Sequence, residues 1–158
     1  MLGQGTAALA DYSRDFGSIC ERVPALVLRP ADDMDVVSAL RIAAEHEFPI
    51  TTRGAGHSQS GQGLGSGLVL DMARLDRVLS LRADDSLVEV QGGTSWRQVV
   101  DATWRHGLVP IGLTHALDTT VAGTLSVARV GAESFRCGPQ VDNVAYLDIA
   151  TLEGRVLR

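Results

Sequence analysis

The segment from Arg53 to Gly67 constrains this chain more than any other. Six of its fifteen residues are glycine, in the sequence Arg-Gly-Ala-Gly-His-Ser-Gln-Ser-Gly-Gln-Gly-Leu-Gly-Ser-Gly. Residues of this kind do not fill a hydrophobic core, so the segment is predicted to be a loop. Glycine also lets backbone N–H groups approach an anion without a Cβ clash. The residues alone leave two interpretations open: a phosphate or diphosphate site, and a solvated hairpin.

Two familiar phosphate-binding motifs do not fit this loop. The dinucleotide fingerprint would need a third glycine soon after Gly54-Ala55-Gly56, and the sequence has none at the required place. The Walker motif needs a lysine, whereas all 14 basic residues of the chain are arginine. The same observation excludes chemistry that depends on a Schiff-base lysine. The loop therefore belongs to neither class.

The rest of the chain alternates short strands with two helices. Apolar spacing predicts one helix between Asp32 and Pro49 and another between Ser95 and Gly107, where Ser95 and Gln98 fit a capping box. Short apolar runs predict strands at 25–29, 50–52, 68–71, 78–81, 87–91, 144–150 and 154–157. This order predicts an α+β fold of two small mixed lobes.

Four bulky side chains of the helices have ordinary structural interpretations. Trp96 and Trp104 are predicted to share one helical face and to lie in the core. His46 and His106 fall in the last turn of each helix, where a cation suits the helix dipole.

The composition of the chain argues against several classes of binding partner. The chain has 158 residues and a net charge of −5, and its acidic residues are dispersed, which argues against a nucleic-acid partner. No apolar run approaches the length of a membrane span, and the first twenty residues lack the pattern of a signal peptide. Cys20 and Cys137 show no metal-ligand spacing, so we expect two free thiols, no metal site and a cytoplasmic location.

Two motifs carry a resemblance to a known family. The loop Arg53–Gln62 resembles the diphosphate loop of flavoproteins of the vanillyl-alcohol-oxidase and p-cresol-methylhydroxylase type, nearest to cytokinin dehydrogenase-like oxidoreductases. The stretch Val121–Ser126, followed by Ser134–Val144 with its Phe-Arg-Cys-Gly-Pro-Gln segment, resembles the same branch. Both motifs occur in the family's order and spacing between about Arg29 and Arg158.

The resemblance implies an FAD-binding domain over residues 25–158, preceded by a lead-in segment, residues 1–24. It places the FAD diphosphate on the loop, and it allows a covalent bond between His57 and the flavin 8α-methyl group. A non-covalent loop histidine and a plain surface residue are the alternatives for His57. The implied cofactor-binding residues are Arg53, Gly54, Ala55, Gly56, His57, Ser58, Gln62, Thr120, Gly123, Ser126 and Val130.

Three positions depart from the family pattern. His115 stands where the family has a catalytic aspartate, and it is either a substitute base or a plain loop residue, so the catalytic residues stay unknown. Arg129 replaces a glycine, which would crowd the cofactor or reach solvent, and Cys137 replaces a histidine. A fourth departure is length, because the family's substrate domain is absent from this sequence.

These observations imply three functional hypotheses. The first is the FAD-binding domain of an oxidoreductase acting on a C–H next to an amine or alcohol, with a small-molecule substrate only if another chain supplies the substrate domain. The second is a truncated, non-catalytic FAD-binding module or relic. The third is a structural domain without a ligand. The open flavin face would be apolar, so a protein partner that covers it is expected.

Overall fold

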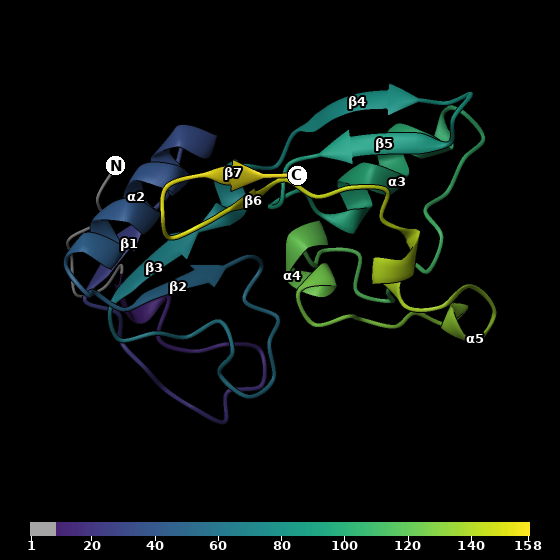
Figure 1. Cartoon of the computed structure of the whole chain (residues 1–158). Coiled ribbons are helices and arrows are strands. Elements are labelled where there is room, and N and C mark those ends of the chain that lie inside the picture. Colours follow the sequence, from purple (N-terminus) through teal and green to yellow (C-terminus); the bar gives the residue numbers. More distant parts are fainter. Residues whose placement is uncertain (1–8) are drawn as a thin grey trace. The chain divides into compact units, whose positions relative to one another are not determined.

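The computed structural model describes residues 9–158, which divide into two compact units (Figure 1). Within the described residues, unit 1 is formed by residues 9–74 and Tyr146–Arg158, and unit 2 by Leu75–Ala145. Each unit combines short strands with short helices. The predicted α+β class with two small mixed lobes is therefore confirmed.

Unit 1 is built on a three-stranded parallel sheet in the order β1-β3-β2. The strands are β1 (Leu26–Leu28), β2 (Ile50–Arg53) and β3 (Leu68–Asp71), and the short helix η1 (Met72–Arg74) follows β3. Leu68 is in register with both Leu26 and Ile50, so the three strands end at one edge. Val69 and Leu70 of the central strand are fully buried, as the apolar run predicts.

Helix α2 (Asp33–Glu45) connects β1 to β2. The Asp35 N–H donates to Asp32 Oδ1 over 2.9 Å, and Asp35 Oδ2 accepts from the Ala31 N–H over 2.8 Å, so the predicted helix start is confirmed. Four apolar residues at helical spacing are buried: Val36, Val37, Ala39 and Ala43. His46 is the C-cap residue, so it lies at the helix end but one residue beyond the last turn, in which the sequence placed it.

A small hairpin completes unit 1. It pairs β6 (Ile149–Ala150) with β7 (Val156–Leu157), and β6 contacts α2. The predicted strand over 144–150 is wrong for residues 144–148. Tyr146 and Leu147 are exposed there, and β7 offers only two residues for pairing, so the longer apolar run finds no partner strand.

Unit 2 contains an antiparallel hairpin of β4 (Val78–Arg82) and β5 (Leu87–Val90), which packs on α3 (Trp96–Trp104). Three short helices follow: α4 (Val121–Leu125), α5 (Ser134–Cys137) and η2 (Gln140–Asn143). The capping box of Ser95 and Gln98 is present.

The two tryptophans of α3 differ in burial. Trp96 is 8% exposed and lies in the core, as predicted. Trp104 is 69% exposed, so its predicted core position is wrong. At about 100° per residue, eight residues turn the side chain roughly 80° away from that of Trp96, and Trp104 also ends the helix.

Candidate functional site

The glycine-rich loop Arg53–Gly67 begins at the carboxyl end of β2. Arg29 follows β1 and Asp71 ends β3, so both lie at the same edge of the sheet. In open sheets of parallel strands, ligands bind at this edge. The fold therefore places the loop where a binding site is expected.

The loop offers a run of unused hydrogen-bond donors. The backbone N–H groups of residues 55–59 donate no hydrogen bond to any residue that the structure describes. Gly56 within this run has φ +68°, and a Cβ there would lie 2.4 Å from Arg53 Nη2. A turn with consecutive free amides is a favourable environment for an anion.

Arg53 adds a cation to the loop. Its Nη2 donates to the Arg14 carbonyl over 2.9 Å, and its guanidinium lies 5.6 Å from the centre of the Tyr12 ring. Arg53 Nη1 is buried and has no hydrogen-bond partner among the described residues. A buried cationic donor without an acceptor is costly unless something binds it. This atom is consistent with an anionic ligand beside the loop.

The carboxylate of Asp15 also binds the loop. Its Oδ2 accepts from Ser58 Oγ over 2.8 Å and from the Gly61 N–H over 2.7 Å, and its Oδ1 accepts from the Ser18 N–H. Burial disfavours the carboxylate, but the hydrogen bonds from Ser58, Gly61 and Ser18 outweigh it and hold the pKa of Asp15 below its ordinary value. Sequence reasoning missed Asp15, because it lies in the predicted lead-in segment.

Phe16 and Gly17 also contact the loop. The Phe16 N–H donates to the Gly56 carbonyl over 2.9 Å, and the Gly17 N–H donates to the Ser58 carbonyl over 3.1 Å. The Phe16 ring stacks on the His57 ring, with 4.4 Å between centroids and 10° between planes. Residues 9–24 of the predicted lead-in therefore include direct neighbours of the candidate site.

A polar network supports the sheet edge beside the loop. Arg29 Nε donates to Asp71 Oδ2 over 2.9 Å, and the Tyr12 hydroxyl donates to the same oxygen over 2.5 Å. Burial, followed by the hydrogen bond to Asp71, raises the pKa of Tyr12, so the phenol stays protonated. Arg29 and Asp71 pair with each other in this network, and no member of it occupies the N–H groups of residues 55–59.

The remaining expected cofactor residues lie in unit 2. Thr120 is buried and precedes α4, and Gly123 and Ser126 lie on that helix and at its end. Ser126 Oγ donates to the Ala122 carbonyl over 2.7 Å, and Val130 is 64% exposed. The Val121 and Ala122 N–H groups donate to Thr94 and Gly92 carbonyls, so they are not free for a phosphate.

The three departures from the family pattern also lie in unit 2. His115 is an exposed loop residue. Arg129 is half-buried, and its carbonyl accepts from the Gln140 N–H over 3.1 Å. Cys137 is a free thiol, as is Cys20.

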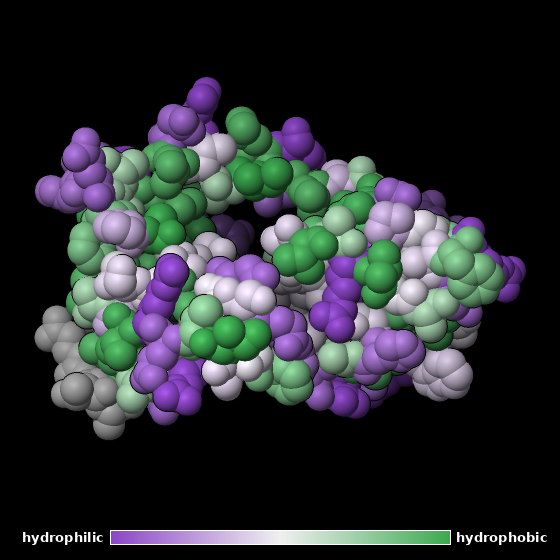
Figure 2. Space-filling view, turned by 90° about the horizontal axis from the view of Figure 1, so that it is seen from below, coloured by the Kyte–Doolittle hydropathy of each residue, from purple (hydrophilic) through white to green (hydrophobic). Residues whose placement is uncertain are grey.

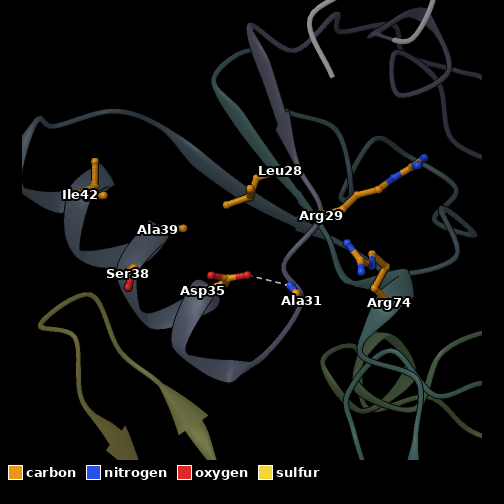
Figure 3. Close-up of a pocket in the computed structure, with 8 residues that line it drawn as sticks. All are labelled: Leu28, Arg29, Ala31, Asp35, Ser38, Ala39, Ile42 and Arg74. Atoms are coloured by element: carbon orange, nitrogen blue, oxygen red, sulfur yellow. Dashed lines mark hydrogen bonds between the residues drawn. The ribbon is translucent and has the colours of Figure 1, made fainter. Parts of the chain in front are cut away.

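A separate pocket of about 440 Å³ lies between α2 and the ends of β1 and η1 (Figure 3). Arg29 in its lining is paired with Asp71, and Asp35 accepts from Ala31. The other lining residues are mainly small or apolar: Leu28, Ala31, Ser38, Ala39, Ile42 and Arg74. Unlike the loop, the pocket presents a carboxylate, that of Asp35, beside its arginines, so an anion there would meet a like charge.

Residues 9–158 show neither a metal-binding cluster nor a membrane-spanning helix. No group of three or more His, Cys, Asp or Glu side chains in this range is arranged to hold a metal ion. No helix in it is both long and apolar enough to cross a membrane.

Known proteins resemble this chain over most of its length. Residues 24–158 match the family model described as FAD binding domain. The chain is 41% identical over 152 residues to cytokinin dehydrogenase 7 of Oryza sativa subsp. japonica, and 38% identical over 159 residues to cytokinin dehydrogenase 5 of Arabidopsis thaliana. These alignments cover 92% and 95% of this chain. The chain spans 29% of the length of each of these relatives.

Proposed function

This chain belongs to the FAD-binding domain family, and from that premise we propose that its glycine-rich loop binds the diphosphate of FAD. FAD is the cofactor that the sequence predicts and the family match indicates. The observation that carries the proposal is the run of N–H groups over residues 55–59, which find no acceptor within residues 9–158, beside Arg53 Nη1, which finds none there either. A diphosphate supplies the acceptors that both lack.

The loop side chains differ in what they can give to the cofactor. Ser58 donates its hydroxyl hydrogen to Asp15, so it serves a phosphate through its backbone N–H. Gln62 Oε1 accepts from the Ser60 N–H, which leaves its amide nitrogen as the free donor. Gly54, Ala55 and Gly56 carry little or no side chain, which lets the backbone approach the diphosphate closely. Thr120, Gly123, Ser126 and Val130 stay the predicted contacts of the flavin and ribityl groups.

His57 is the proposed attachment residue for the flavin. It lies inside the run of free amides, and its half-buried ring is held face-on by Phe16. The nitrogens of the imidazole lie on its edge, so a stack on one face of the ring leaves both of them uncovered by Phe16. When bound, FAD supplies the two-electron redox chemistry for removing hydrogen from a C–H next to an amine or alcohol. In this proposal the chain's own residues bind and orient the cofactor.

The second candidate function is FAD binding without turnover by this chain alone. It is favoured by the 29% share of the cytokinin dehydrogenases that the chain spans, and by the exposed position of His115. Under this proposal a protein partner completes the flavin site. Apolar residues reach the surface in several places (Figure 2), and unit 2 exposes Val127, Val130 and Phe135.

Titration of the purified protein with FAD, followed by absorption and calorimetry, tests the proposal. We expect tight binding of FAD, much weaker binding of riboflavin, and at least tenfold weaker binding of FAD by Arg53→Gln. Arg41→Gln, which alters an exposed pair with Glu45 in the same unit, is the matched control. Equal affinity for riboflavin and FAD would refute a diphosphate site.

Acid precipitation of the FAD-loaded protein tests the role of His57. Yellow colour in the pellet of the wild type, and in the supernatant of His57→Ala, would support covalent attachment. Colour in the supernatant of both proteins would support a non-covalent site. Substrate-dependent bleaching by amines or alcohols separates the two candidate functions.

A further inference from the structure

We propose that Asp15–Ser18 is a clamp that holds the glycine-rich loop in its anion-binding form and fixes the ring of His57. These four residues lie before the region that the family model matches, which begins at residue 24. The proposal concerns the shape of the loop, and only its consequence for FAD affinity rests on the proposed function. The clamp acts through backbone pairing, a close approach, a ring stack and a buried carboxylate.

The backbone pairing engages the acceptors of the loop and leaves its donors unused. Within residues 55–59, the clamp binds the carbonyls of Gly56 and Ser58, which flank His57. The N–H groups of the same five residues make no hydrogen bond to the described part of the chain. Binding a loop through its carbonyls restricts its dihedral angles without occupying its amides. The clamp thereby preorganises the amides for an anion.

The approach of the two segments requires glycine at position 17. A Cβ at Gly17 would lie 1.9 Å from the Gln59 carbonyl oxygen and 2.5 Å from its carbon. Real Cβ atoms do not come so near to backbone atoms, so any other residue here would push the segments apart. Because both partners are backbone, no side chain can move aside to relieve the clash.

Phe16 is a positioning residue for His57. It is 64% exposed, so burial in a core does not explain its place. Its ring lies nearly parallel to the imidazole at stacking distance. A stack over one face fixes the plane of His57, and Phe16 itself covers neither the opposite face nor the ring edge. The backbone pairing on each side of His57 supports the same orientation.

The carboxylate of Asp15 links the clamp to two positions of the loop. Asp15 is 6% exposed, and its carboxylate receives hydrogen bonds from Ser58 and Gly61 in the loop and from Ser18 in the clamp. One buried charge thus links segments more than 40 residues apart in the sequence. Charge-assisted hydrogen bonds are about twice as strong as neutral ones, which makes this the strongest link.

Proton NMR of the protein without FAD tests the clamp directly. A ring stacked at 4.4 Å shifts the Hε1 resonance of His57 upfield, so we expect it upfield of that of the exposed His46. Phe16→Leu should return the His57 resonance to the ordinary position. Ile19→Leu is the matched control, because Ile19 is an exposed apolar residue of the same segment at 74% exposure. A His57 resonance that is unchanged by Phe16→Leu overturns the proposal.

FAD titration of clamp variants tests the consequence for binding. We expect Gly17→Ala to weaken FAD at least tenfold and Ile19→Leu to leave the affinity unchanged, with the far-UV circular dichroism of both like the wild type. If Gly17→Ala does not fold, Asp15→Asn provides the same comparison. Wild-type affinity in a folded variant that has lost the His57 upfield shift overturns the proposal. If the wild type binds no FAD, the proposed function fails, and the His57 shift alone decides on the clamp.

Discussion

At the scale of single residues, Asp15 shows how a buried carboxylate makes stability depend on pH. Its folded-state pKa lies below the ordinary value, so the folded protein binds this proton more weakly than the unfolded chain does. The stabilisation is complete above the ordinary pKa of about 3.9 and is lost as the pH falls through the folded-state pKa.

The Asp15→Asn variant tests this dependence. At pH 7 we expect it to lower the free energy of unfolding by about 1–2 kcal/mol, because an amide replaces the acceptor of Ser58 and Gly61. Urea unfolding from pH 7 to pH 3 should show the gap between wild type and variant narrowing in acid. A gap that stays constant over this range would contradict the assignment.

Trp96 in α3 carries a second residue-scale prediction. Its Nε1 donates to Thr124 Oγ1 over 2.9 Å, and both residues are buried. Thr124→Val keeps the shape but leaves the indole N–H unpaired, so we expect a loss of about 1–3 kcal/mol in unfolding free energy. Denaturant unfolding measures it, with Trp104→Ala as the comparison. Because Trp104 is exposed, a larger loss from its substitution would contradict this account.

At the scale of elements, the start of α3 is fixed by its capping box. Ser95 Oγ accepts from the Gln98 N–H over 3.2 Å, and the Ser95 N–H donates to Gln98 Oε1 over 2.8 Å. We expect Ser95→Ala to cost about 1 kcal/mol in thermal or denaturant unfolding. Ser38→Ala, at an exposed position within α2, should stay within about 0.5 kcal/mol of wild type. Equal losses of stability from the two substitutions would mean that the capping box is not the cause of the loss.

Local signals explain which elements the sequence could predict. The starts of α2 and α3 depend on partners three residues away, and the loop on its own glycines, so each is visible in a short window. The contacts of Asp15 with Ser58 and Gly61 span 43 and 46 residues and follow no periodicity. The loop could therefore be predicted as a site, but its clamp could not. The strand predicted over 144–150 is too long, because pairing depends on a partner strand that the apolar run itself does not reveal.

At the scale of the whole molecule, cofactor binding should appear as thermal stability. A ligand at 100 times its Kd stabilises the folded state by about 2.7 kcal/mol. For a chain of this size that amounts to roughly 5–11 °C in Tm. We expect FAD to give such a shift in differential scanning calorimetry and riboflavin at the same concentration to give little. Similar shifts from both compounds would mean that the loop amides play no part in binding.

The division of unit 1 into two stretches of sequence affects the order in which the chain acquires structure during synthesis. Unit 2 is one continuous stretch, Leu75–Ala145, so all its parts leave the ribosome before the hairpin of β6 and β7. Helix α2 emerges early but meets β6 only after the whole of unit 2 has been made. A ribosome paused after Ala145 thus presents an incomplete first unit to chaperones and proteases, and that exposure lasts until residues 146–158 have emerged.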